Sequence, residues 1–494
     1  MHSVIPIRSS YIAKAVVVAV SLGVALSPTV AHSREFADMI TAPFVDPLFA
    51  RPPTLDSGKI LPGDDDIRPC PVTVDPASPL TLSNVVDFSL CNNPQVASAW
   101  VSIKVQSAAL GEARASYLPT LNGGFSKVSD RTGFPNSNFE ASSIKSNTAF
   151  GNVSWRLFDF GGRNANNRSA AALLDAALAS HDAALQKTLS TVVAAYFDVQ
   201  TTLASLQARQ KSEQLSQQTV DATQRREKRG AGAQSDTLQA MTALAKAKLG
   251  TSRTRGDYQK NISILIYTMG LPADTKLNLV EDVDDPVDSI REDLNAWLTQ
   301  AQIGHPAIIA AKAQVASARE RIIATRSEGL PTIDLNANFY RNGRPNQGLS
   351  STSTRETLVS LTLNIPISDG FSTTYKIRGA QAQVEQKEAD LREVERQTLM
   401  DVTKAHADAM SSLQNLDASQ KLLDAAYAAV NTVQRKFDRG AVDILEILNT
   451  QSALLDAQQE RIRCLSEWRS ARLRLLASVG VLGANSISER GFKN

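Results

Sequence analysis

Apolar residues recur every seven positions in two long stretches of the chain that contain no proline, residues 136–271 and 367–494. In the first stretch they form two rows four positions apart, which consist of Leu178, Leu185, Val192, Val199 and Leu206, and of Leu189, Tyr196 and Leu203. Two such rows make the apolar seam of a coiled coil. The pattern returns 210 residues later, at Leu399, Val402, Leu413 and Leu416.

These rows predict a long helical hairpin in each half of the chain. The first arms are expected at residues 164–228 and 372–438, about 65 residues each, or on the order of 100 Å at the α-helical rise. With 494 residues, 43% of them apolar and 21% charged, the chain is long enough for two or more units of this kind.

Before each hairpin, apolar and polar residues alternate. The clearest segments contain Ile333, Leu335, Ala337 and Phe339, and then Val359, Leu361, Leu363, Ile365 and Ile367. In the first half Val153, Trp155 and Leu157 alternate, and residues 121–128 do so more weakly, with polar tips expected at 129–147 and 341–356. Each segment predicts a strand of about ten residues with one apolar face. Such strands are typical of transmembrane β-proteins, although a soluble sheet with one buried face has the same alternation.

A short turn, Leu-Pro-Thr, precedes the strands in both halves, with Pro119 answered by Pro331. Proline disfavours a helical conformation in the residue before it, so both prolines mark a change from helix to strand. The sequence therefore contains two copies of a unit that consists of a helix, a turn, two strands and a helical hairpin. We expect the two copies at residues 81–280 and 281–482, followed by a tail at 483–494.

The N-terminal residues predict export. Residues 1–31 contain Arg8 and Lys14, then a short apolar run and a small-x-small cleavage site at Ala31, as in a signal peptide. The run is too short for a transmembrane helix, and a retained anchor is the alternative. Nine of the twenty prolines lie between residues 41 and 80, so residues 32–80 are expected to form an extended arm without a core.

Charge and hydropathy narrow the class of partner. Without residues 1–31, 50 basic side chains balance 50 acidic ones, which argues against nucleic acid as a partner. No later stretch has 18 consecutive apolar residues, so the exported chain is expected to cross a membrane only through a β-barrel. Four strands cannot close a barrel, but they can contribute to a shared one.

The strand-to-helix passages VSWRLFDFGGR and LTLNIPISDGF and the hairpin tips RREKRGAGAQSDTLQA and RKFDRGAVDILEILNTQSALL make the chain similar to the TolC family of outer-membrane efflux and secretion channels. The first tip departs from the pattern, because Glu227 stands where an aromatic residue is usual. The resemblance implies a mixed α and β membrane protein. It also implies a homotrimer, a twelve-stranded barrel in the outer membrane and a long α-helical barrel across the periplasm.

The resemblance also implies partners. These are outer-membrane lipid, a periplasmic adaptor (membrane fusion protein) and an inner-membrane pump or ABC transporter. The N-terminal arm and the phrase LTLSNVVDFSLCNNPQ look most similar to type I secretion members, such as the outer-membrane component for adenylate cyclase toxin. A multidrug efflux component is the alternative. A periplasmic coiled-coil adaptor is disfavoured, because it would have one hairpin and β-rich soluble modules, and an exported hydrolase is disfavoured by the missing catalytic site.

Two groups of residues at the hairpin tips are candidate sites. The resemblance implies that the tips meet the adaptor, through Arg229, Gly230, Ala231, Arg439, Gly440, Ala441 and Val442. Beyond each turn, Glu446 and Asn449 lie three apart on one helix face, as do Asp236 and Gln239. If three chains converge there, these four side chains form rings at the narrowest opening, and the carboxylates select cations. A solvated helix face with acids favoured by the helix dipole is the alternative.

The remaining chemistry points to structure rather than catalysis. Cys70 and Cys91 are expected to form a disulfide in the oxidising compartment, with two unpaired thiols as the alternative, and Cys464 is expected to be a buried thiol. No cysteine has the context of a lipid anchor. The five histidines are scattered, and DFGG at 159–162 and GAGA at 230–233 lack the neighbouring motifs of kinases or phosphate loops. We expect no enzyme activity, no metal and no cofactor.

Overall fold

The computed structural model describes residues 48–50, 79–133, 135, 142–280, 293–344 and 354–482. The chain divides into two compact units, Met1–Phe49 and Ala50–Asn494, and every helix and strand below belongs to the second. The predicted signal peptide, most of the predicted arm and the predicted tail lie outside the described residues.

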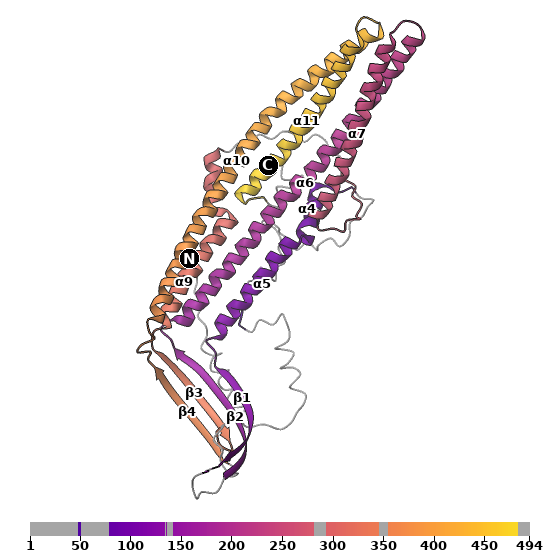
Figure 1. The fold of residues 1–494 in the computed structure, drawn as a ribbon. Coiled ribbons are helices and arrows are strands. Elements are labelled where there is room, and N and C mark those ends of the chain that lie inside the picture. The colour runs from indigo at the N-terminus through magenta and orange to yellow at the C-terminus, as the bar shows by residue number, and fades with distance from the viewer. Residues whose placement is uncertain are drawn as a thin grey trace. The chain divides into compact units, whose positions relative to one another are not determined.

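The helices and strands follow the same order in the two halves of this unit. In the first half they are α4 (Leu82–Asn92), α5 (Pro94–Ala115), β1 (Thr120–Thr132), β2 (Ser142–Phe158), α6 (Gly162–Lys228) and α7 (Gln234–Thr268). In the second half they are α8 (Leu294–Gly304), α9 (Pro306–Ser327), β3 (Thr332–Arg341), β4 (Arg355–Asn364), α10 (Ser372–Asp438) and α11 (Ile444–Val479). The long arms α6 and α10 have 67 residues each, within two residues of the predicted bounds. The sheet lies at one end of these helices and the hairpin turns at the other (Figure 1).

The four strands form one antiparallel sheet in the order β1-β2-β3-β4. Strands β3 and β4 have 10 residues each, as predicted, whereas β1 and β2 have 13 and 17 and extend into the segment that was expected to be a polar tip. The expectation that Ile365 and Ile367 continue the last strand is wrong, because β4 ends at Asn364. Pro366 between them has no N–H to donate and restricts the backbone of the residue before it.

The predicted seam of α6 forms the core of the hairpins. Leu185, Leu189 and Val199 are fully buried and pack with residues of α4, α7 and α11 in one cluster. In the second half Val402 and Leu416 are buried at the corresponding positions of α10. The hydrophobic effect of burying side chains of this size, about 1.5–3 kcal/mol each, holds the long helices side by side. No described helix is both long enough and apolar enough to cross a membrane.

The second short helix of each half starts with a different cap. The Asn93 side chain accepts a hydrogen bond from Gln95 N at 2.8 Å at the start of α5, whereas His305 Nδ1 accepts from Ala307 N at 3.2 Å at the start of α9. Burial lowers the pKa of the His305 imidazole, and the Asp401 carboxylate offsets part of this effect. A hollow of about 520 Å³ beside His305 is lined by further charged side chains, those of Lys187, Lys404, Asp408 and Arg474.

We expect the His305 cap to make stability depend on pH. A neutral imidazole can accept at Nδ1, and a protonated one cannot. Because the folded pKa lies below the unfolded value of about 6.5, the unfolded chain binds more protons as pH falls through that value, and stability decreases. Thermal unfolding of the purified protein at pH 7.5 and pH 5.5 should therefore show a lower midpoint at the acidic pH.

The variant His305→Asn installs the cap found at Asn93 and removes the titrating group. It should keep the cap energy, about 0.5–2 kcal/mol, at both pH values and lose part of the pH dependence. Asn93→Ala is the matched control, because it removes a cap that does not titrate. An equal pH dependence in the wild type and His305→Asn would contradict this role.

Candidate functional site

The two hairpin tips have the same backbone conformation. Gly230 and Gly440 have φ values of 70° and 75°, in the left-handed region that glycine tolerates. In each tip the glycine N–H donates to the carbonyl three residues earlier, and the N–H of the following alanine donates to the carbonyl five residues earlier, with all four bonds at 2.9 Å. This is a Schellman motif, which satisfies the last carbonyl groups of α6 and α10 and lets the chain reverse.

A cross-contact joins the two tips. The Arg226 guanidinium at the end of α6 donates from Nη2 to the Phe437 carbonyl of α10 and lies over the Phe437 ring, 4.4 Å from its centre. Below it an apolar cluster fills the space between the hairpins, with buried members Val220, Ala240, Leu244, Val433, Phe437, Ile444 and Ile447. Sequence reasoning missed Arg226, and only the departure at Glu227, which corresponds to Phe437, indicated that the tips differ.

The predicted docking and pore residues all lie at these tips. Arg229, Gly230, Ala231, Arg439, Gly440 and Ala441 are exposed, and Val442 packs in part against the apolar cluster. Asp236 and Glu446 lie in the first turns of α7 and α11, and Gln239 and Asn449 follow one turn later. Glu446, Gln239 and Asn449 are exposed and Asp236 is half-buried, so the structure leaves these polar groups available at one end of the hairpins.

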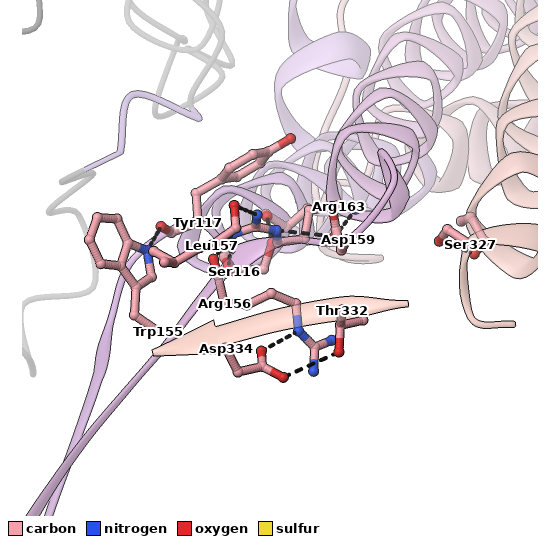
Figure 2. A network of polar contacts seen from close by, with 12 residues as sticks. Ser116, Tyr117, Trp155, Arg156, Leu157, Asp159, Arg163, Ser327, Thr332 and Asp334 are labelled. Carbon is pink, nitrogen blue, oxygen red and sulfur yellow. Dashed lines mark hydrogen bonds and ion pairs between the residues drawn. The ribbon is translucent and has the colours of Figure 1, made fainter. Parts of the chain in front are cut away.

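A second polar network lies where the helices meet the sheet (Figure 2). Arg163 in the first turn of α6 donates to the Arg156 carbonyl at 2.7 Å, the Leu157 carbonyl at 3.2 Å and the Ser116 carbonyl at 3.5 Å. Its Nε donates to Asp159 Oδ2 at 3.1 Å. One guanidinium therefore donates to carbonyl groups at the ends of both α5 and β2.

Two further hydrogen bonds of β2 lie next to this network, one on each face of the sheet. Arg156 Nε donates to Asp334 Oδ1 at 2.9 Å, and the indole N–H of Trp155 donates to the Tyr117 carbonyl at 2.9 Å. These bonds tie β2 to β3 and to the turn before β1. The second half has no equivalent of the Arg163 guanidinium, because Thr373 occupies that position, where its backbone N–H donates to Asp369 Oδ2 at 2.7 Å.

The two faces of the sheet differ in character. The register places Leu121, Val153, Ala337 and Val359 in one row across all four strands. On the opposite face Asn152 donates to Asn338 at 2.6 Å. The apolar face is not covered by the helices: Leu121 is 77% exposed and Leu361 67% exposed. An uncovered apolar sheet face of this extent marks a surface that contacts lipid or another protein.

The cysteines and the candidate metal ligands are placed as follows. Cys91 is disulfide-bonded, Cys464 is a buried free thiol whose pKa is raised by burial, and Cys70 lies outside the described residues. The Cys70–Cys91 pairing stays a prediction. Pro119 and Pro331 directly precede β1 and β3. Within the described ranges no three His, Cys, Asp or Glu side chains gather in a way that could hold a metal ion.

The fold of this chain consists of two helical hairpins, each with one arm of 67 residues, joined to a small antiparallel sheet, and solved outer membrane channels share it. The Campylobacter jejuni CmeC outer membrane channel superposes with a TM-score of 0.72 at 15% sequence identity, over 81% of this chain and 86% of that one.

The sequence matches the family described as outer membrane efflux protein over residues 85–270 and again over 297–481. The chain belongs to this family, and the resemblance to TolC-like channels is thereby confirmed. Protein CyaE of Bordetella pertussis is 32% identical over 421 residues, which cover 85% of this chain and 88% of that protein. Alkaline protease secretion protein AprF of Pseudomonas aeruginosa is 23% identical over 52% of this chain and 54% of its own length.

The start of α6, next to Arg163, packs closely against the end of α9 through Gly162 and Ser327. A Cβ at Gly162 would lie 2.1 Å from Ser327 Oγ and 3.1 Å from Ser327 Cβ. Gly162→Ala should therefore destabilise the protein by about 1–3 kcal/mol through overpacking. Adding Ser327→Gly removes both atoms and should restore most of the loss.

The readout is the midpoint of denaturant unfolding, compared in a double-mutant cycle. Gly256→Ala in α7 is the control, because nothing lies within 4 Å of a Cβ there, and it should be neutral or stabilising. If the double variant is no more stable than Gly162→Ala alone, the loss of stability does not come from the contact with Ser327.

Proposed function

We propose that the chain forms a homotrimeric channel-tunnel for export across the outer membrane and the periplasm. The observation that carries the proposal is the sheet with one uncovered apolar face, attached to two helical hairpins whose first arms, α6 and α10, have 67 residues each. Strands β1 and β4 have only one neighbour each among the described strands, so three copies could join edge to edge into a barrel of twelve strands. The helical hairpins, whose first arms α6 and α10 are about 100 Å long at the α-helical rise, would then cross the periplasm as a second barrel built from two repeats per chain.

The proposed cargo is protein, exported by type I secretion together with an ABC transporter and a periplasmic adaptor. Similarity to a protein named for the secretion of alkaline protease supports this choice. Membership in a family described by efflux supports the alternative, a multidrug component. Crosslinking in the native membrane and co-purification would decide between them, because the two systems differ in the inner-membrane partner. In either case the chain moves cargo passively and is not an enzyme.

Docking to the adaptor is assigned to the tip residues around the two Schellman turns. Bulk at Gly440 would hinder a partner hairpin, so Gly440→Leu should abolish the appearance of secreted proteins in the medium while the trimer still assembles in the membrane. Gly440→Ala is the matched control, since it has the same strain at positive φ but little bulk, and it should keep most of the export. Normal export by an assembled Gly440→Leu trimer would count against docking at this surface.

The pore constriction is assigned to Asp236, Gln239, Glu446 and Asn449. Convergence of three chains would turn each position into a ring, and rings of carboxylates favour cations at close range. In planar-bilayer recordings of the full chain we expect cation-selective channels, with lower selectivity and weaker block by multivalent cations in Glu446→Ala and Asp236→Ala. A double variant with unchanged selectivity would defeat the constriction assignment, and a wild-type protein that forms no pore would defeat the channel itself.

A further inference from the structure

The charged residues of the sheet are sorted by face. The register places five basic residues on the same face as the apolar row of Leu121 and Val153, namely Lys127, Arg131, Lys145, Arg341 and Arg355. The acidic residues of the strands, Asp130, Asp334 and Glu356, lie on the opposite face with Arg156, which pairs with Asp334. Alternation of side chains along a strand makes this assignment independent of side-chain conformation.

The five residues, here called the basic band, lie beyond the apolar rows at the end of the sheet far from the helices. On β3 the last apolar residue of this face, Phe339, is followed two positions later by Arg341, the last residue of the strand. On β4 Arg355 is the first residue, and on β1 Lys127 follows Phe125 by two positions. The apolar surface therefore gives way to positive charge in all four strands at this end.

Within the band the basic groups repel one another. Arg341 and Arg355 are directly opposite in the register, an arrangement that destabilises a sheet when the charges are alike. Lys145 is diagonal to both Lys127 and Arg131, at about 7–8 Å for such neighbours. All five side chains are exposed, and none forms an ion pair with a described residue. Arg344 nearby is different, because it is paired with Glu356.

We propose that the basic band binds the phosphate groups of lipid headgroups in the membrane leaflet at the far end of the sheet. The inference rests on the proposed function, in which the apolar face contacts lipid. A phosphorylated lipid is complementary to this surface in two ways. Its acyl chains can contact the exposed apolar rows, and its phosphate groups can neutralise the unpaired cations of the basic band. Arginine can bind a phosphate through two parallel hydrogen bonds, and basic residues beside a bilayer attract anionic headgroups.

The experiment uses the full-length protein in nanodiscs of phosphatidylcholine that contain diphosphoryl lipid A or the same glycolipid without phosphates. Retained glycolipid is counted by native mass spectrometry after extraction. The wild type should retain the phosphorylated form in preference to the dephosphorylated one. Lys127→Gln with Arg341→Gln and Arg355→Gln should weaken that preference by about fivefold for each charge removed.

The matched control removes three exposed basic residues from the helices, by Lys211→Gln, Lys246→Gln and Lys248→Gln, and should behave as the wild type. Inorganic phosphate added at the same concentration should not displace the glycolipid, since the acyl chains contribute to its binding. Displacement would show a site for free phosphate and overturn the proposal.

Equal retention of the two glycolipids by the wild type, or an unchanged preference in the triple variant, would overturn the inference. Pore formation by the same samples separates the two proposals, because a conducting wild type without lipid preference leaves the channel function standing. If the triple variant does not assemble, Arg355→Gln alone decides. This change relieves the repulsion with Arg341, so it should assemble and still lower the preference about fivefold, and an unchanged preference would overturn the inference.

Discussion

The structure depends on the change from helix to strand and back, which each half of the chain makes at one end of its long helices. The last turn of a helix has four carbonyl groups without a partner in the helix, and backbone groups beyond the end of a strand have no partner in the sheet. In the first half Arg163 donates to three carbonyl groups at the ends of α5 and β2 and forms an ion pair with Asp159. Because Arg163 lies in the first turn of α6, its bonds connect the start of the 67-residue helix to the end of β2.

The long helices were predictable because two independent patterns agree. A seven-residue apolar period and the absence of proline fixed the bounds of α6 and α10 within two residues. The strands of the second half were equally clear in their alternation. In the first half the alternation of apolar and polar residues is weak, because Gly123, Gly124 and several serines and asparagines interrupt it. Strand β1 extends to Thr132 because it pairs with β2 up to that residue, and no local preference in the sequence indicates this. Hydrogen bonds between the backbones of two strands cannot be read from a single sequence, because every residue carries the same backbone groups.

The candidate sites were predictable to different degrees. The glycine turns are visible because only a few residues tolerate positive φ, and the acids of the first helical turns follow at a fixed spacing. Arg163 and Arg226 were not visible, since their main partners are carbonyl groups that every residue carries. In the sequence, the basic residues of the strands except Arg156 stand at odd positions and the acidic ones at even positions. Only the register of the four strands shows that the residues at odd positions share one face of the sheet.

Where the halves differ, the differences complement one another. Phe437 stands in the second tip where the first has Glu227, and Arg226 of the first tip stacks on that ring and donates to its carbonyl. A guanidinium over an aromatic ring contributes about 0.5–1 kcal/mol at exposed sites and more when water is excluded, as the buried Phe437 favours. A glutamate at position 437, as the first tip has at 227, would leave the Arg226 guanidinium without a ring to stack on. The aromatic residue thus stands in the tip whose ring Arg226 of the other tip contacts, so the packing of one hairpin against the other uses the difference between the two tips.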